Sequence, residues 1–253
     1  MTISTILWSL AATVCLVQIT NLCTTIYLHR SVTHRGLKLH PVVSFLMHLE
    51  LLLATGIEPR EWAAVHRKHH HFSDQEGDPH SPYIEGLWRV LFLNVQMYRK
   101  ELRTPGMVQK YTPDWKNDLL DRIPHAGRVG PMLGATLLAL AFGSLLGIGF
   151  WAGAALGVSS FILHVGIYVF LNSMINSVCH KVGYRNFDNL ATNLQWVAWI
   201  TAGEGLHNNH HEFPTSARFR ALRGEFDPAW PVIRLMEMLH LAEYNRNALA
   251  KAA

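Results

Sequence analysis

Two long stretches of the chain are apolar and carry no charged side chain. Residues 1–29 and 129–180 contain no Lys, Arg, Asp or Glu, and every Lys and Arg falls in the remaining sequence. Residues 3–28 exceed the ~20 residues with which a helix crosses the hydrocarbon core of a bilayer. They lack the positive leader and the small-residue cleavage site of a signal peptide. The first stretch therefore predicts a membrane-spanning helix.

The second stretch is long enough for two helices that cross the membrane in opposite directions. Three glycines, Gly147, Gly149 and Gly153, mark the expected turn between them, because glycine tolerates tight turn conformations. Together the two stretches predict three membrane spans, over about 3–28, 129–149 and 153–176.

A shorter apolar stretch, 41–57, contains His48 and Glu50. An ionisable side chain in the middle of a bilayer is costly, so a fourth span here is the less favoured alternative. If 41–57 lies in the membrane interface instead, every Lys and Arg lies on one side of the membrane. The positive-inside rule makes that side cytoplasmic. We therefore expect an interfacial helix over 41–57.

These patterns predict an all-α integral membrane protein, with one domain over 1–253. Residues 58–128 and 177–253 would form a helical cap on the cytoplasmic side, with apolar, Trp-bearing helices at 84–98 and 189–203 lying on the membrane surface. Charged residues make up 16% of the chain, against about 25% in soluble domains. Three cysteines exclude a disulfide scaffold, the hydrophobicity excludes disorder, and nothing indicates a nucleic acid partner. The net charge of +4 suits an anionic lipid leaflet.

The chain has 16 histidines, and many of them fall in spaced groups at the ends of the apolar stretches. In an HxxHH triplet the three imidazoles can point from one helical face to one place, because positions i, i+3 and i+4 share that face. Asn176 and His180 share a face in the same way, whereas His29 and His34, five apart, need not. The groups are His29 with His34, His66 with His69 and His70, Asn176 with His180, and His207 with His210 and His211.

Nine grouped histidines exceed what one metal ion can bind, so two ions with four or five imidazoles each are expected. Imidazole binds Fe, Zn, Cu and Ni alike, so the ligand type does not name the metal. Structural zinc sites usually recruit Cys ligands, and the sequence offers no Cys ligands and no glutamate-rich helix set of the soluble di-iron bundles. Of the seven remaining histidines, His80 is expected to support the site from beside it. The other six are expected to pack without binding metal, and they are His40, His48, His71, His125, His164 and His240.

The motifs resemble those of the integral-membrane fatty acyl desaturases of the acyl-CoA delta-9 type, especially the shorter bacterial members. Sterol desaturases, fatty acid hydroxylases and alkane monooxygenases also have histidine boxes, but the third and last motifs here are similar to the acyl desaturase branch. The resemblance runs from about residue 20 to the C-terminus. Its motifs are HRSVTH at 29–34, EWAAVHRKHHHFSD at 61–74, NSVCH at 176–180, DPHSP at 78–82, GYR at 183–185 and GEGLHNNHHEFP at 203–214.

The resemblance implies that the protein binds two Fe2+ ions. It also implies that the protein lies in the inner membrane of a bacterium, with its metal site facing the cytoplasm. It implies that Asn176 contacts one ion through water, and we expect Glu204 and Asp74 to orient ligating imidazoles through their second N–H. The implied iron ligands are His29, His34, His66, His69, His70, His180, His207, His210 and His211.

The chain departs from the family pattern in three places. The animal enzymes have two spans before the first histidine box, and this chain has room for one. Those enzymes carry an Arg that contributes to CoA binding two residues before the second box, where this chain has Ala64. An acyl chain esterified in phospholipid is therefore an alternative to acyl-CoA. Because no cytochrome domain is fused to the chain, electrons must come from a separate donor, such as a ferredoxin, a rubredoxin or a cytochrome b5-like protein with its reductase.

The expected function is an O2-dependent desaturation that forms a cis double bond, of the delta-9 type, in a long acyl chain. Hydroxylation of acyl chains or alkanes is an alternative with the same iron chemistry. Metal binding or transport without catalysis is less favoured, since the three spans contain only His164 and no carboxylate. We expect Trp62 to line an apolar tunnel for the acyl chain. Arg67 and Lys68 are expected to attract an acidic carrier or electron donor.

Overall fold

The computed structural model describes residues 2–246, so the expected domain end at 253 lies outside the described residues. The described chain is mostly helical, with one two-stranded antiparallel sheet formed by β1 and β2. In chain order the elements are α1 (Ile3–Cys23), η1 (Thr24–Thr33), β1 (Leu37–Leu39), α2 (Pro41–Thr55), α3 (Pro59–Phe72), α4 (Leu87–Leu102), α5 (Met107–Tyr111), α6 (Ala126–Leu145), α7 (Phe150–Ser177), η2 (Val178–His180), α8 (Gln195–Ile200), α9 (His207–Glu212), α10 (Ala229–Met238) and β2 (Ala242–Tyr244).

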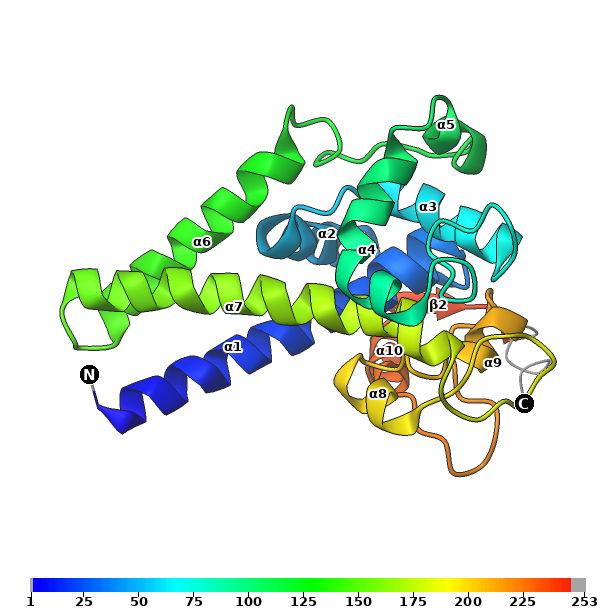
Figure 1. The fold of residues 1–253 in the computed structure, drawn as a ribbon. Helices are drawn as coiled ribbons and strands as arrows, with labels where there is room; N and C mark the ends of the chain where they lie inside the picture. Colours follow the sequence, from blue (N-terminus) through cyan, green and yellow to red (C-terminus); the bar gives the residue numbers. More distant parts are fainter. Residues whose placement is uncertain (1, 247–253) are drawn as a thin grey trace.

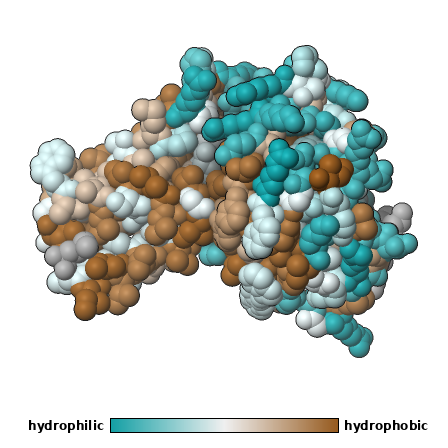
Figure 2. Space-filling model, viewed as in Figure 1, coloured by the Kyte–Doolittle hydropathy of each residue, from teal (hydrophilic) through white to brown (hydrophobic). Residues whose placement is uncertain are grey.

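Three helices project together from one side of the molecule. In Figure 1, α1, α6 and α7 extend to the left, while the shorter elements gather at the right. Figure 2 shows that the projecting part is mostly hydrophobic and the other part mostly hydrophilic. Large apolar side chains of the projecting helices are exposed, for example Trp151 at 83% and Leu145 at 81%. Such an apolar surface is stable in hydrocarbon and unstable in water.

Three helices are long and apolar enough to cross a membrane, and they are Ile3–Thr33, Ala126–Leu145 and Phe150–His180. The predicted all-α membrane architecture with three spans is therefore confirmed. The first span differs from its expected end at 28, because α1 continues without a break into η1. η1 is a π-helix, whose wider turn joins residues five apart.

The turn between the second and third spans is shorter than expected. It consists of residues 146–149, with Gly147 at φ +65° and Gly149 at φ +90°, conformations that glycine adopts without strain. Gly153 belongs to α7 instead of the turn. A Cβ atom at Gly153 would come within 2.4 Å of the Phe142 carbonyl oxygen, so this glycine permits close packing of α7 on α6.

The stretch expected to be an interfacial helix, 41–57, contains α2 and the start of a sharp bend. α2 and α3 meet at 88°, and the pair is apolar enough to form a broken span or a re-entrant loop. α2 packs closely on α6, where Cβ atoms at Gly130 and Gly134 would meet the carbonyl oxygens of Leu52 and Leu53. The interfacial position of 41–57 stays a prediction.

The remaining elements form the cap. The helix expected at 84–98 is present as α4, whereas the one expected over 189–203 is reduced to α8, six residues long. A buried ion pair lies in the core of the cap. Both terminal amino groups of the Arg30 guanidinium donate to the Asp227 carboxylate, at 2.8 and 3.0 Å. Arg30 also lies 3.7 Å over the ring of Phe219. Because both charges are buried and paired, loss of either partner would leave an uncompensated charge in the core.

A single methyl group at the α6–α7 contact tests the close packing of the spans. A Cβ atom at Gly157 would lie 2.6 Å from the Leu138 carbonyl oxygen, whereas one at Gly166 on the same helix meets nothing within 4 Å. We expect Gly157→Ala to lower stability by about 1–3 kcal/mol, because the backbones must separate. Gly166→Ala is the matched control. Thermal unfolding in detergent measures the difference, and equal melting temperatures for the two variants would contradict this packing.

Candidate metal centre

The π-helix η1 places the first two histidines on one face. The backbone N–H of His34 donates to the carbonyl of His29, five residues earlier, at 3.1 Å. In an α-helix, residues five apart diverge, but the wider π-turn aligns them. The ring centroids of His29 and His34 lie 4.9 Å apart. The local backbone therefore settles a point that spacing alone left open.

Each HxxHH triplet divides its three imidazoles between two groups. The sequence predicted that the three imidazoles of a triplet could point to one place, and this prediction is wrong. In α3, His66 and His70 belong to one group and His69 to the other. In α9 the division is reversed: His210 joins the first group, while His207 and His211 join the second. Residues four apart share a side of the helix, and the residue between them faces across to the other group.

Two groups of imidazoles result, and each could hold a metal ion. In each group the ligand atoms lie within 4.8 Å of one another. All nine residues are buried or half-buried. The first group consists of His29, His34, His66, His70 and His210, and the second of His69, His180, His207 and His211.

Three of the nine histidines have a carboxylate beside the ring nitrogen that faces away from the group. One of these histidines belongs to the first group and two belong to the second. His180 Nδ1 lies 2.6 Å from Asp74 Oδ2, and His29 Nδ1 lies 2.7 Å from Glu204 Oε2 in an ion-pair contact whose angle is poor for a hydrogen bond. His69 Nδ1 lies 3.0 Å from each oxygen of Asp78. Asp78 was not among the residues expected at the site, although it belongs to the DPHSP motif.

Two of these carboxylates are held in the ionised form. Burial by itself would raise the pKa of Glu204, but His29 and Arg30 bring it below its usual value. Burial by itself would also raise the pKa of Asp78, but the contacts with His69 and His80 outweigh this effect and bring the pKa below its usual value. An ionised carboxylate accepts a hydrogen bond from Nδ1–H, which leaves the other nitrogen of that imidazole without a proton.

Ring nitrogens of different histidines face one another inside the groups. His207 Nε2 lies 3.0 Å from His180 Nε2, and His69 Nε2 lies 3.3 Å from His211 Nε2. Asp74 and Asp78 accept hydrogen bonds from the Nδ1–H groups of His180 and His69, so the facing Nε2 atoms of these two rings carry lone pairs. Such lone pairs are the donors that a metal ion requires. The donor set therefore fits two metal ions.

Burial also keeps these imidazoles neutral, the form that binds metal. Burial and the charges of neighbouring histidines lower the pKa values of six of them well below the usual 6.5. Metal binding requires unprotonated imidazole, so these groups need not lose a proton at neutral pH before they bind. The six are His34, His66, His70, His207, His210 and His211.

Side-chain amides hold the short helix α9 in place. Asn208 Oδ1 accepts hydrogen bonds from the backbone N–H groups of Asn186 and Phe187, at 2.8 and 2.9 Å. Asn209 Nδ2 donates to Glu225 Oε2 at 2.9 Å. A six-residue helix is marginal by itself, so these bonds fix the direction of its three histidines. The two asparagines inside HNNHH were the signal for this anchor, but Glu225 could not be found from spacing.

The other residues singled out in the sequence lie as follows. Asn176 is half-buried one turn before His180. The Trp62 ring stacks on His66 with centroids 4.6 Å apart, so it packs against a histidine of the first group. Arg67 donates to the Thr33 and Tyr111 carbonyls, and Lys68 Nζ contacts Glu101 at 2.6 Å. Both cations are thus engaged inside the protein.

Several ungrouped histidines have partners of their own. His48 Nδ1 lies 2.6 Å from Asp118 Oδ2, and with Asp121 these residues form a further set of possible ligands. His164 is buried in α7 and contacts Thr20 Oγ1 at 3.0 Å. His80 stacks near His69, with centroids 4.6 Å apart, and burial lowers its pKa to about 3. His71 is exposed beside the second triplet.

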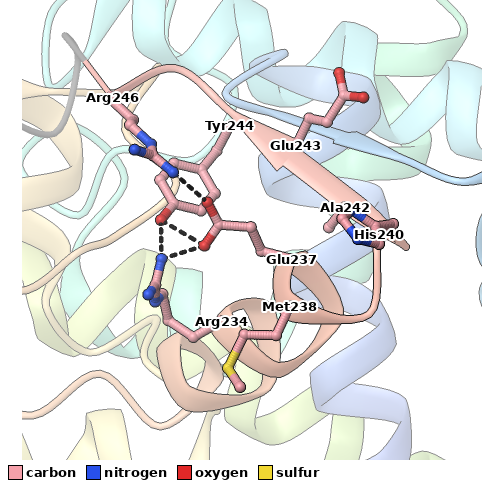
Figure 3. Close-up of a pocket in the computed structure, with 8 residues that line it drawn as sticks. All are labelled: Arg234, Glu237, Met238, His240, Ala242, Glu243, Tyr244 and Arg246. Carbon is pink, nitrogen blue, oxygen red and sulfur yellow. Dashed lines mark hydrogen bonds and ion pairs between the residues drawn. The ribbon is translucent and has the colours of Figure 1, made fainter.

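A surface hollow of about 530 Å³ lies away from the histidine groups, beside α10 and β2. Figure 3 shows that Arg234, Glu237, Tyr244 and Arg246 pair with one another in this hollow, while Glu243 points away from them. Glu237 accepts from Tyr244 at 2.9 Å and from Arg246 at 3.2 Å, and it also pairs with Arg234. This internal pairing and the wide opening make the hollow a poor candidate for catalysis.

Comparison with known proteins decides between the families that use histidine boxes. The family model described as fatty acid desaturase matches residues 6–231, most of the chain. The chain belongs to the fatty acid desaturase family. The expected resemblance is therefore confirmed, and this desaturase is an enzyme of lipid metabolism.

Curated relatives of this desaturase come from plants and a cyanobacterium. The Delta-9 desaturase-like 2 protein of Arabidopsis thaliana is 32% identical over 234 residues, which cover 88% of this chain and 72% of the relative. The acyl-CoA C20 Delta5-desaturase of Anemone leveillei is 34% identical, with 87% and 67% covered. The sn-1 stearoyl-lipid 9-desaturase of Anabaena variabilis is 32% identical, with 86% and 76% covered. Their names include CoA and lipid substrates and two bond positions.

Metal content tests the two groups separately. We expect His66→Ala and His69→Ala each to lower the metal bound per chain by roughly one ion, because each removes a ligand from a different group. His71→Ala is the matched control, since His71 is exposed and adjoins the same triplet. Elemental analysis of the purified variants measures the stoichiometry. An equal loss in His71→Ala would show that surface histidines bind the metal.

The lowered histidine pKa values predict how acid affects the metal-free protein. Unfolded histidines titrate near 6.5, whereas the buried ones stay neutral at lower pH. Below about pH 6.5 the unfolded state therefore binds more protons, and each buried histidine lowers stability by up to ~1.4 kcal/mol per pH unit. Thermal unfolding with a chelator should show a melting temperature that is flat from pH 8 to 7 and falls below 6.5. A melting temperature that rises on acidification would contradict the burial of neutral imidazoles.

Proposed function

We propose that this protein is an O2-dependent fatty acyl desaturase that forms a cis double bond, of the delta-9 type, in a long acyl chain. The observation that carries the proposal is the pair of imidazole groups, in each of which the ring nitrogens converge within 4.8 Å of one another. This arrangement lies where the apolar helices α1 and α7 enter the cap. A centre at this place can act on an acyl chain of which one part stays in the bilayer while the other part reaches the cap.

The proposed cofactor is a pair of Fe2+ ions. The first would be held by His29, His34, His66, His70 and His210, and the second by His69, His180, His207 and His211, with Asn176 acting through water. When bound, two irons would supply the activation of O2 that removal of hydrogen from unactivated methylene groups requires, which no acid–base pair of side chains can supply.

The chain's own residues position and shield the centre. Asp74 and Asp78 hold His180 and His69 in fixed tautomers and directions through their Nδ1 atoms, and Glu204 lies in ion-pair contact with Nδ1 of His29. Trp62 covers His66 with its ring and contacts His29 from the side. An apolar wall beside the ligands excludes water and guides a hydrocarbon chain, which must be placed within about 1 Å for efficient reaction.

The proposed partners follow from the reaction and the relatives. The substrate is an acyl chain carried by CoA or by a phospholipid, as named for different relatives. The co-substrate is O2, and a separate ferredoxin, rubredoxin or cytochrome b5-like donor with its reductase supplies electrons. We propose that the protein lies in a bacterial inner membrane with the centre facing the cytoplasm, because every Lys and Arg lies on one side of the membrane when 41–57 is interfacial.

Expression in a host without its own desaturase activity tests the function. We expect new monounsaturated chains with one dominant bond position, measured by mass spectrometry of the lipids after derivatisation of the double bond. His66→Ala should abolish the product and His71→Ala should retain it, because only the first belongs to a histidine group. Hydroxylated chains without monounsaturated ones would replace the proposal with a hydroxylase.

A further inference from the structure

We propose that Thr25 is a positioning residue for the first histidine group, through a hydrogen bond from its hydroxyl to Glu204. The same hydroxyl joins this carboxylate to the buried ion pair of Arg30 and Asp227. The inference rests on the proposed function, since it assigns a further residue to the same centre. Thr25 lies in η1, four residues before His29, and is fully buried.

The Thr25 hydroxyl departs from the pattern of its own helix. Five other hydroxyls along α1 and η1 donate to a backbone carbonyl four or five residues earlier, which is the usual local bond of Ser and Thr in a helix. The Thr25 hydroxyl contacts two charged side chains instead. Its direction is therefore set by tertiary contacts. The five other residues are Ser9, Thr13, Thr20, Thr24 and Thr33.

The single proton of this hydroxyl fixes which partner donates. A guanidinium has only donors, so Thr25 Oγ1 accepts from Arg30 Nε, at 3.2 Å. The proton of the hydroxyl is then left for Glu204 Oε1, with which it forms a hydrogen bond. An ionised carboxylate has only acceptors, so this direction satisfies all three groups. The hydroxyl therefore links a cation to a carboxylate in one orientation.

The two oxygens of Glu204 serve different partners. Oε1 accepts from Thr25, and Oε2 lies 2.7 Å from His29 Nδ1. The contact with His29 has a poor angle for a hydrogen bond, so it does not by itself hold the carboxylate in place. Thr25 supplies the directed bond. Without this bond the carboxylate is free to rotate away from the imidazole.

The opposite end of this series of bonds is fixed by backbone groups. Asp227, which pairs with Arg30, accepts from the N–H of Phe219 at 2.9 Å and from that of Ala229 at 3.2 Å. Arg30 also donates to the Ala217 carbonyl at 2.9 Å. Hydrogen bonds to ionised groups are stronger than those between neutral groups. The hydroxyl therefore contacts an ion pair that is itself held in position.

The loop that carries Glu204 packs on the same ion pair. Gly203 directly precedes Glu204 and has φ +107°, a conformation that glycine adopts without strain. A Cβ atom at Gly203 would lie 2.3 Å from Asp227 Oδ1 and 2.9 Å from Arg30 Nη2. Because this side chain is missing, the ion pair and the loop backbone lie in direct contact. Glu204 is thus positioned by its own backbone as well as by Thr25.

His29 is the ligand through which this arrangement reaches the first group. Its Nε2 lies 2.9 Å from His210 Nε2, inside that group. A carboxylate on Nδ1 orients the ring and raises the basicity of the nitrogen that binds metal. The carboxylates beside the second group belong to Asp74 and Asp78, in another segment. Loss of the Thr25 hydroxyl should therefore weaken one ion and leave the other unchanged.

Metal affinity of the purified protein tests this role without use of the reaction. Thr25→Val removes the hydroxyl and keeps the shape of the side chain. Anaerobic titration of the metal-free protein with Co2+, followed by its visible absorption, measures the affinity of each site. We expect Thr25→Val to weaken one ion about ten-fold and Thr25→Ser to restore it, because serine supplies the same hydroxyl. Thr25→Ala is the second variant, to be used where the valine side chain prevents folding.

Thr24→Val is the matched control. Thr24 is the neighbouring buried residue of η1, and its hydroxyl contacts the Thr20 carbonyl at 2.8 Å and Tyr168 Oη at 2.9 Å. Both affinities should stay unchanged in this control. An equal loss in Thr24→Val and Thr25→Val would reduce the effect to packing of η1 and would overturn the inference. Failure of Thr25→Ser to restore the affinity would overturn it as well.

A double-mutant cycle shows whether Thr25 acts through Glu204. Glu204→Leu removes both carboxylate oxygens and should weaken the same ion. Addition of Thr25→Val to Glu204→Leu should then cause no further loss, because the hydrogen bond is already absent. Losses that add independently would place the effect of Thr25 elsewhere and would contradict the inference.

Product analysis separates this inference from the proposed function. With a reductase, a donor, O2 and saturating metal, Thr25→Val should lower kcat about ten-fold and leave KM unchanged, because Thr25 acts on a metal ligand and not on the substrate. Product formation with unchanged metal affinities in Thr25→Val would overturn the inference and leave the function standing. A selective loss of one affinity, in a protein that desaturates no acyl substrate, would support the inference and contradict the function.

Discussion

The convergence of nine imidazoles is the constraint on which the rest of the cap depends. The nine histidines come from four chain segments and are buried or half-buried, and polar ring nitrogens removed from water are costly unless each has a partner. The protein must therefore hold the rings in place. Carboxylates fix Nδ1 atoms, amides anchor α9, and the Arg30–Asp227 pair locks the first segment onto the C-terminal part of the cap.

The position of the centre follows from two helices that connect the membrane to the cap without interruption. His29 lies in η1, the direct continuation of α1, and His180 follows the end of α7. Movement of either histidine relative to the membrane would require a break in backbone hydrogen bonding, which is costly in an apolar environment. The depth of the two histidine groups is thus set by the same helices that fix the protein in the bilayer. A substrate chain held at the membrane surface then meets the centre at a constant distance.

Much of this architecture is readable from local sequence patterns. The absence of charge over 1–29 and 129–180 reflects the cost of charged groups in hydrocarbon, so the spans could be placed within a few residues. The histidine spacing indicated two metal ions before the fold was known. Helix ends were less accurate: α1 continues into η1, and Gly153 packs in a helix instead of a turn. The choice between π- and α-helix depends on contacts made by distant segments, which local propensity does not encode.

The sequence by itself determined the kind of chemistry, the number of spans and the set of nine histidines, because hydropathy and ligand type are properties of individual residues. The tertiary structure alone decided which histidine belongs to which group, since each triplet sends its residues to both sides of its helix. It also decided that Asp78 and Glu225 support the site and that Arg67 and Lys68 are engaged internally. These outcomes depend on which segments pack together, and side chains distant in sequence meet only when the core is closed.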